Sequence, residues 1–413
     1  MHLDWGPEVD AFRAELVAFL DEHAPPEAKN ARDWAMVDRS KRAREPASGS
    51  TAQRAKQSRS SEVVPQWARD WQATLFDHGW MIPGYPPERG GRNASSVQTL
   101  VYLEEMSARG IPRSLHFPGY AIVAPSLLDF GTPAQQELVP AAIRGDTIWC
   151  IGMSEPNAGS DLANLQTRAV LDGDRFVVNG QKVWTSYAMV AGKCCLYVRT
   201  DPAAPKHQGI SLLIVDMDSP GIDVRPLTHI NGNADFAEVF FTDVEVPVAN
   251  LVGELNGGWR ITQGSLAHER AGLWVEAVAR LEQTVTGLVD LAHRRGIAQD
   301  PTVRRAIAKG YQQAASLRAL GYKGFTSFAA RGTSAPEHSY MKLATSELGK
   351  SLYELGMEIQ GAYGPVIDEE RGEEAGRWAL SFFVSFANTI AGGTSEIQRN
   401  IIAQRVLGLP RSA

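Results

Sequence analysis

The chain has 413 residues and a formal net charge of −6, and 44% of its residues are hydrophobic. Its length exceeds what one hydrophobic core usually serves, so two or three domains are expected. The acidic balance disfavours a general nucleic-acid-binding protein, and no apolar run is long enough to span a membrane.

The N-terminal segment predicts a helix at the start of a cytoplasmic protein. Four apolar residues recur on one helix face before Pro25-Pro26 stops it: Val9, Phe12, Leu16 and Phe19. The segment has neither the basic start nor the apolar core of a secretory signal. Only three cysteines occur, without metal-ligand or CxxC spacing, so we expect a reducing cytoplasmic location and no metal site.

A basic segment, residues 29–62, follows this helix. It contains nine Lys and Arg against four Asp and Glu and is poor in apolar residues. Such a composition is typical of a solvated or partly disordered excursion. A second interpretation is that its cations meet the phosphate groups of a ligand or an acidic partner subunit. Both interpretations stay open.

Hydrophobic periodicity divides the chain into three domains. Residues 1–146 show helical spacing, residues 147–258 contain short strand-like runs, and residues 259–413 return to helical spacing. The strand-like runs are rich in Val, Ile, Phe and Thr: CCLYVRT, GISLLIVDMD, IDVRPL and AEVFFTDVEVP. They predict a central β-barrel or β-sandwich. Two long apolar stripes in the last domain predict members of a helical bundle, with further helices at about 338–360 and from Thr394 onward.

The stretch from Cys150 to Ser186 combines a loop of small and polar residues with two strand-like segments. We expect a hairpin turn at Asn179-Gly180, because both central residues of such a turn must take positive φ. The second strand would hold Trp184, Thr185 and Ser186 on a rigid edge. Facing the loop, this edge would give a flat ring ligand close backbone approach, short hydroxyl donors and an aromatic wall. The alternative is an ordinary β-hairpin with a polar loop.

Two motifs in this stretch, MSEPNAGSD and NGQKVWTS, resemble the paired flavin-site motifs of the acyl-CoA dehydrogenase family. The similarity continues through FTDVEVPVANLVGELNGGW and IAGGTSEIQRNIIAQRVLGLP, in the family's order and spacing, from about residue 80 to the C-terminus. It implies a multidomain α+β fold with an N-terminal helical domain, a central β-barrel or sandwich and a C-terminal four-helix bundle. It also implies a flavoprotein of fatty acid, lipid or sterol degradation that assembles as a dimer or tetramer of one or two kinds of chain.

The resemblance implies a specific reaction. Non-covalently bound FAD would serve the α,β-dehydrogenation of an acyl-CoA thioester to the trans-2-enoyl-CoA, with electrons passed to an electron-transfer flavoprotein or a similar acceptor. The phosphates that the basic segment could meet would then be those of coenzyme A. The flavin carries the electron chemistry, and the protein must supply a carboxylate that removes the α-proton.

The position of that carboxylate departs from the commonest family pattern. Many members carry a Glu immediately before the Gly-Thr of the C-terminal motif, but here that position is Gly392. Other branches place a Glu followed by Arg on the first long helix of the C-terminal domain, as in Glu269-Arg270 of LAHERAGLW. The resemblance thus implies Glu269 as the catalytic base and Arg270 as a substrate-binding residue. The alternative for Glu269 is an ion pair on the helix surface, and we expect His268 to be a packed neighbour.

The remaining site residues follow from the same motifs. Ser154 matches a hydroxyl beside the pyrimidine edge of the flavin, Ser186 matches the hydroxyl that hydrogen-bonds N5, and Trp184 matches the residue that shields the ring. Ser160 matches a loop serine near the pantetheine or the pyrophosphate. The full set of implied cofactor-binding residues is Met153, Ser154, Ser160, Trp184, Thr185, Ser186, Arg295, Gly361, Gly393, Thr394 and Glu396.

Two of these matches are incomplete. The family's RxxFG arginine, which reaches the flavin pyrophosphate of a neighbouring subunit, aligns with Arg295, but the Phe and Gly of that motif are absent. The GGxG motif becomes Gly361-Ala362-Tyr363-Gly364, and Glu358 stands where a Gln often contacts the adenosine part. A Glu facing phosphate would be repulsive, so we expect Glu358 to point elsewhere. The altered motifs favour a mixed assembly.

Three rival functions remain at this stage. The first is an acyl-CoA oxidase on the same fold, which would differ in oxygen access. The second is a non-catalytic subunit that completes the flavin site of another chain, as the absent Glu at Gly392 suggests and Glu269-Arg270 opposes. The third, a DNA-associated flavoprotein, would need an extended basic groove, and only residues 29–62 are basic.

Overall fold

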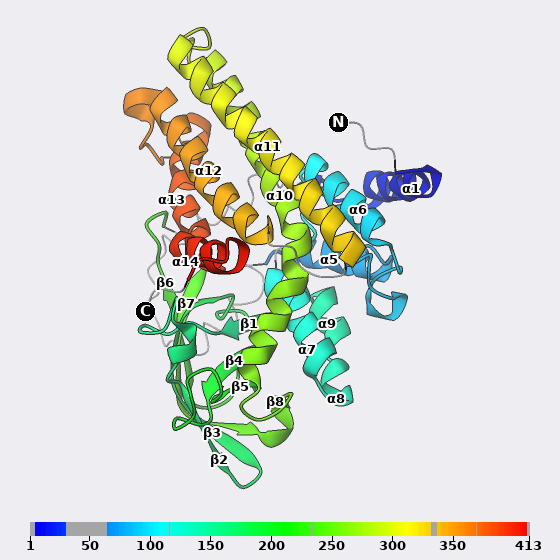
Figure 1. Ribbon diagram of the computed structural model, residues 1–413, viewed down its shortest axis with the longest axis vertical. Coiled ribbons are helices and arrows are strands. Elements are labelled where there is room, and N and C mark those ends of the chain that lie inside the picture. The colour runs from blue at the N-terminus through cyan, green and yellow to red at the C-terminus, as the bar shows by residue number, and fades with distance from the viewer. Residues whose placement is uncertain are drawn as a thin grey trace.

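The computed structural model in Figure 1 describes residues 5–29, 64–114, 116–232, 234–331, 337–368 and 370–410. Within its helices, the side chains of residues 263–273, 328–331 and 337–339 lie outside this description. The basic segment predicted at residues 29–62 therefore falls almost wholly outside the described residues.

The N-terminal part is helical, as predicted. Its helices are α1 (Pro7–His23), α2 (Pro26–Lys29), α5 (Gln66–Asp77), α6 (Ser96–Arg109), α7 (Ala124–Phe130), α8 (Pro133–Gln136) and α9 (Val139–Arg144). The four apolar residues predicted on one face of α1 are all buried, which confirms that face. Helix α6 begins with a capping box, in which the Ser95 hydroxyl accepts from Gln98 N–H while the Gln98 side chain accepts from Ser95 N–H.

The central part is one connected sheet of eight strands. They are β1 (Trp149–Gly152), β2 (Arg168–Asp172), β3 (Arg175–Ser186), β4 (Lys193–Arg199), β5 (Ile210–Asp216), β6 (Ile222–Leu227), β7 (Phe236–Pro247) and β8 (Leu251–Val252). The order is β6-β7-β3-β2-β4-β5-β8, and β1 pairs with β4. The β2–β4 junction is a single pair, Arg168 with Arg199. Side chains from β3 and β7 share one core with side chains from β4 and β5, so the two halves form the predicted sandwich.

The prediction of a hairpin turn at Asn179-Gly180 is wrong. The chain reverses at Gly173-Asp174 instead, where Asp172 of β2 pairs with Arg175 of β3. Strand β3 runs straight through Asn179 and Gly180, with a register shift there against β7. Two residues of β7 there oppose the single residue Asn179, so the extra residue of the bulge lies on β7. Gly180 allows a close approach of the neighbouring backbone, since a Cβ there would lie 2.7 Å from Thr167 Cα. Local turn chemistry was therefore a poor guide, because Asn-Gly here lies inside a strand.

The cysteines show how the sheet separates two hydrophobic cores. Cys194 and Cys195 are adjacent on β4, and both are buried. Cys194 belongs to the core inside the sandwich, whereas Cys195 belongs to the core shared with the helices. Both faces of β4 are therefore covered, since neighbouring residues of a strand point to opposite faces.

The C-terminal part contains the helices α10 (Gly258–Arg294), α11 (Pro301–Arg331), α12 (Glu337–Gln360), α13 (Arg377–Asn388) and α14 (Ser395–Ile401). Figure 1 shows α10 running from the sheet to the far end of the molecule, with α11 and α12 beside it. Helix α10 also packs on α6 and β5, and the N-terminal and C-terminal helices share one hydrophobic core. The bundle was predicted, but α13 was not located in the sequence.

None of the helices described is both long and apolar enough to cross a bilayer. Among the same residues, no group of three or more His, Cys, Asp or Glu side chains is arranged to hold a metal ion.

Candidate active site

The structure brings the two central motifs together at one edge of the β domain. The loop between β1 and β2, residues 153–167, lies against the part of β3 just before Trp184. Val183 N–H donates to Ser154 O at 2.9 Å, and Lys182 Nζ donates to Met153 O at 3.0 Å. The juxtaposition of a small-residue loop and the Trp-Thr-Ser edge is therefore confirmed, although β3 and not a local hairpin provides the edge.

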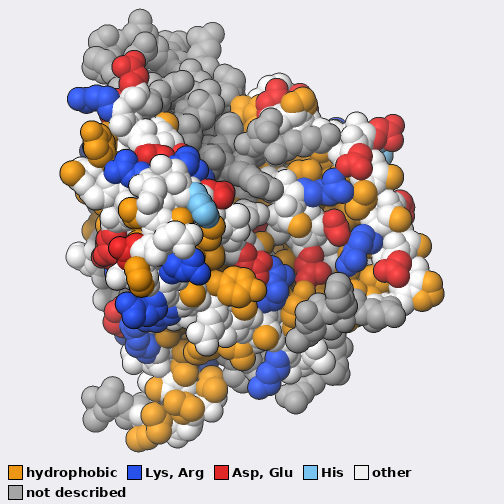
Figure 2. All heavy atoms as spheres, turned by 90° about the horizontal axis from the view of Figure 1, so that it is seen from above, with side chains coloured by type: hydrophobic (Ala, Val, Ile, Leu, Met, Phe, Trp, Pro, Cys, Tyr) orange, Lys and Arg blue, Asp and Glu red, His pale blue; other side chains and the backbone are white. Residues whose placement is uncertain are grey.

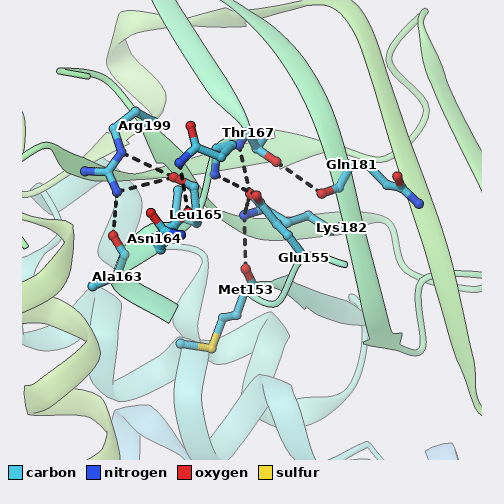
Figure 3. Close-up of polar contacts among 10 residues, drawn as sticks. Met153, Glu155, Ala163, Asn164, Leu165, Thr167, Gln181, Lys182 and Arg199 are labelled. Carbon is cyan, nitrogen blue, oxygen red and sulfur yellow. Dashed lines mark hydrogen bonds and ion pairs between the residues drawn. The ribbon is translucent and has the colours of Figure 1, made fainter. Parts of the chain in front are cut away.

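A buried ion pair fastens this junction (Figure 3). Lys182 Nζ lies 2.8 Å from Glu155 Oε1, and the Lys182 side chain is fully buried. The same Glu155 carboxylate accepts from Gln166 N–H at 2.6 Å and from Thr167 N–H at 2.8 Å. One carboxylate thus binds both ends of the loop and the neighbouring strand.

The environment of the pair perturbs both ionisable groups. Burial lowers the pKa of Lys182 to about 8, partly opposed by the attraction of Glu155. Burial alone would raise the pKa of Glu155, but its attraction to Lys182 and its hydrogen bonds lower that pKa overall. The two groups are therefore charged together at neutral pH.

Arg199 on β4 holds the second half of the same loop. Its guanidinium donates to Ala163 O at 2.6 Å and to Leu165 O at 3.3 Å (Figure 3). It also donates to Lys206 O at 2.8 Å. These carbonyls belong to segments without regular sheet partners, so a buried side chain satisfies backbone groups that would otherwise stay unpaired.

The edge residues have unusual conformations. Trp184 has φ of +62° and is 60% exposed. Its ring packs edge-on against that of Phe236, with 6.1 Å between the ring centroids. A bulky residue in the left-handed region is strained, and such strain persists where the surroundings enforce it. Thr185 is buried with an unpartnered hydroxyl, and Ser186 ends β3 half-buried.

This edge fits a flat ring such as a flavin. The indole of Trp184 is held outward, where a planar ligand would cover its apolar face. On the loop side, a Cβ at Gly159 would meet no atom within 4 Å, so there is open space beside the backbone. Ser160, predicted near pantetheine or pyrophosphate, is exposed on the same loop.

The C-terminal motif is held by α12 and α14. Gly392 and Gly393 have φ of +67° and +96°, and Lys342 of α12 donates to Gly393 O at 2.6 Å. Thr394 caps α14, because its hydroxyl accepts from Ile397 N–H. The structure thus explains the Gly-Gly-Thr sequence as a left-handed turn with a helix cap.

Glu396 takes part in the same cap. Its own backbone N–H and the Thr394 hydroxyl hydrogen-bond the carboxylate and lower its pKa. The side chain is exposed in the first turn of α14, where a negative charge is favourable. Structurally, Glu396 and Thr394 therefore already have a role in the helix.

Arg295 is engaged by its own chain. Its guanidinium donates to Gln360 O at 3.2 Å, lies 4.0 Å from Glu373 and stands over the Tyr363 ring. Gly361 follows α12 with φ of +60°, in open space. Glu358 is exposed, and its orientation away from a phosphate stays a prediction.

Glu269 and Arg270 belong to α10, and the structure describes their backbone only. The same holds for His268. Their roles stay predictions. Gly392, the alternative base position, has no side chain, and a Cβ there would meet nothing within 4 Å.

Sequence reasoning overlooked the residues that build the junction: Glu155, Lys182 and Arg199. The sequence did contain a signal for Lys182. It is separated by an even number of residues from Phe176 and Val178, which are buried, so all three belong to the same face of the strand. A charged residue at a core-facing position of a strand indicates a buried partner.

The molecule combines a helical domain, a β-sandwich and a helical bundle. Its loop and strand edge suit a planar ligand, as in a protein that binds a flat cofactor. The chain belongs to the acyl-CoA dehydrogenase family. The acyl-CoA dehydrogenase N-terminal, middle and C-terminal domains match residues 40–146, 150–244 and 256–407. It is accordingly an oxidoreductase of that family, as the sequence motifs predicted.

Among curated relatives, the acyl-CoA dehydrogenase IpdE1 of Mycobacterium tuberculosis (strain ATCC 25618 / H37Rv) is 37% identical over 347 residues, which cover 84% of this chain and 89% of the relative. A solved structure titled "Tcur3481-Tcur3483 steroid ACAD" is 31% identical, covers all of both chains and has a TM-score of 0.81. The ChsE4-ChsE5 complex from Mycobacterium tuberculosis is 30% identical over the full length of both chains, with a TM-score of 0.77.

Proposed function

We propose that this chain catalyses the FAD-dependent α,β-dehydrogenation of an acyl-CoA thioester to the trans-2-enoyl-CoA, in the cytoplasm. The observation that carries the proposal is the junction at which Val183 N–H binds Ser154 O, because it sets the small-residue loop beside the outward-facing Trp184. In a member of the acyl-CoA dehydrogenase family, this is the edge where its flavin motifs meet.

The residues at this edge would hold the flavin as their motifs imply. Ser154 and Met153 would line the pyrimidine side, Ser186 would donate toward N5, and Trp184 would cover one face of the ring. A flavin bound there would accept the β-hydride and pass the electrons to an acceptor flavoprotein. The contribution of the chain is to orient the ring and to exclude water from it.

Glu269 is the proposed base, with Arg270 beside it toward the substrate. Gly392 has no side chain that could accept a proton, so the position where the family most often carries its catalytic Glu has no carboxylate here. Glu269 lies on α10, which packs on α6, α12 and β5 and so lies at the meeting point of all three parts of the molecule. A general base requires reach to the α-carbon first and a suitable pKa second.

The substrate we propose is a steroid-derived acyl-CoA, on the strength of the likeness to the structure titled as a steroid ACAD. We propose an assembly with a second chain, and two features support it. Arg295 binds Gln360 and Glu373 of its own chain, so it does not make the contact by which the family's arginine reaches a neighbouring subunit's flavin. Hydrophobic side chains are exposed in the C-terminal part. Figure 2 shows one face of the molecule, on which hydrophobic groups lie between charged ones. The exposed residues include Phe386, Ile390, Val406, Leu407 and Leu409.

The test is anaerobic bleaching of the flavin by a panel of acyl-CoA thioesters, from short and branched to steroid-derived. The substitution Glu269→Gln should leave FAD bound but slow bleaching by at least ~10²-fold, as for loss of a general base. Unchanged bleaching would refute the assignment of Glu269. Slow reoxidation in air fits a dehydrogenase, whereas rapid peroxide release would assign an oxidase.

Two further variants sharpen this test. Asp290→Asn makes the same chemical change at an exposed position of the same helix and should leave the rate unchanged. The double variant Glu269→Gln/Gly392→Glu restores a carboxylate at the other family position, where there is open space but a left-handed φ. Partial recovery of the rate, limited by that strained backbone, is expected.

A further inference from the structure

The Lys182–Glu155 pair connects two parts of the chain that are 27 residues apart in sequence. Lys182 lies two residues before Trp184 on β3, and its Nζ binds both Glu155 and Met153 O. The next residue, Val183, binds Ser154 O. Successive residues of the strand thus bind successive residues of the loop, and this fixes the loop against the strand edge.

Glu155 also closes the base of the loop. Its carboxylate accepts the N–H groups of Gln166 and Thr167, while its backbone exchanges hydrogen bonds of 3.1 Å with Ala158. Ser160 lies on the segment between these contacts. A single side chain therefore sets the shape of the loop as well as its attachment to β3.

Stability does not explain why charges occupy this place. A buried ion pair usually contributes no more than a well-packed hydrophobic pair of similar volume, because both ions lose their hydration. Lys182 is fully buried in the sheet, and a Cβ at Gly152 would lie 3.3 Å from its Cγ, so its aliphatic stem packs closely on β1. An apolar pair would lack the directional bonds to Met153 O, Gln166 N–H and Thr167 N–H.

We infer that Lys182 and Glu155 are positioning residues of the flavin site, which hold Met153 and Ser154 in register with Trp184–Ser186 and so set the affinity for the flavin ring. The inference rests on the proposed function. Neither side chain needs to touch the cofactor. They act through the backbone of the residues that do.

The experiment separates positioning from folding. Apoprotein of the wild type and of the variants, purified with any chain that copurifies, is reconstituted with FAD while the melting temperature of each apo form is recorded. In Lys182→Met/Glu155→Gln both charges are removed, so no unpaired charge stays buried. We expect an apo melting temperature close to that of the wild type, a Kd for FAD at least tenfold higher, and a shifted flavin absorption spectrum.

Two matched variants complete the design. Lys193→Met removes another lysine–carboxylate pair of the same domain, Lys193–Asp216, which lies on β4 and β5 away from the loop, and should not change the affinity for FAD. Glu155→Asp keeps the charge but shortens the side chain by one methylene. It should fold and still weaken FAD binding several-fold, which keeps the test decisive if the double variant does not fold.

The outcomes are distinct. Wild-type affinity for FAD and an unchanged flavin spectrum in the folded double variant, or in Glu155→Asp, would overturn the inference and leave the proposed function intact. A wild-type protein that takes up no FAD would overturn the proposed function itself.

Discussion

Apart from Arg295, the predicted cofactor-binding residues lie in two regions, and these regions are built in opposite ways. The central region, residues 153–186, is fastened inside one domain by buried charges and backbone hydrogen bonds. The C-terminal region, residues 361–396, is held by surface ion pairs and left-handed turns and exposes apolar side chains. The difference is what the proposed assembly with a second chain would require, with the ring side of the proposed site built by this chain alone.

Breaking the buried pair should have the largest effect on stability. Glu155→Leu leaves Lys182 in a fully buried position without its carboxylate, and the free energy of unfolding should fall by about 3–5 kcal/mol. Urea denaturation of the apoprotein measures this. A loss below ~1 kcal/mol would show that the central region is not more tightly fastened than the surface.

Acid should have the next largest effect, through a histidine that is buried against the β domain. His116 is buried beside β1, with Nε2 2.8 Å from Trp149 O, and burial lowers its pKa to about 4 from an ordinary value near 6.5. Between these values the unfolded chain binds the proton that the folded chain excludes, so stability falls as the pH drops from about 6.5 to 4, by roughly 3 kcal/mol.

The check is a series of denaturation curves across that pH range. His116→Gln should flatten the acid-dependent part, whereas His78→Gln, at an exposed position, should leave it in place. An equal slope in all three proteins would remove His116 as its cause.

The C-terminal region should respond least. Glu373 pairs with Arg294 at 3.1 Å and with Arg295 at 4.0 Å, but these side chains are partly exposed, and Glu374 also pairs with Arg294. Glu373→Gln should therefore change the free energy of unfolding by less than ~1 kcal/mol. Thermal denaturation suffices as the measurement, and a loss as large as that of Glu155→Leu would erase the contrast between the regions.

Much of the fold could be predicted because its signals are local. The apolar face of α1, the short strands of the sandwich and the long stripes of α10 and α11 all follow from periodicity. The turn at Gly173-Asp174 was missed because Asn179-Gly180 offered a stronger local signal, and only the pairing with β7 and the contact with Thr167 show that this dipeptide lies inside a strand.

The site divides in the same way. Motif resemblance located Ser154 and Trp184, and the structure brings their segments together through a hydrogen bond that no periodicity reveals. Lys182 and Glu155 lie inside the same motifs, yet their pairing depends on how the loop folds back on β3. The incomplete motif around Arg295 predicted that its contact with a neighbouring subunit is altered. Its partner in the structure, Gln360 O, depends on the packing of α10 against α12.

The division of the molecule by β4 has a practical consequence. Since Cys194 and Cys195 are chain neighbours in separate cores, each thiol can react with an alkylating reagent only when its own side of the sheet opens. Mass spectrometry of singly modified peptides would therefore time the two openings independently, with reporters that the native chain already contains.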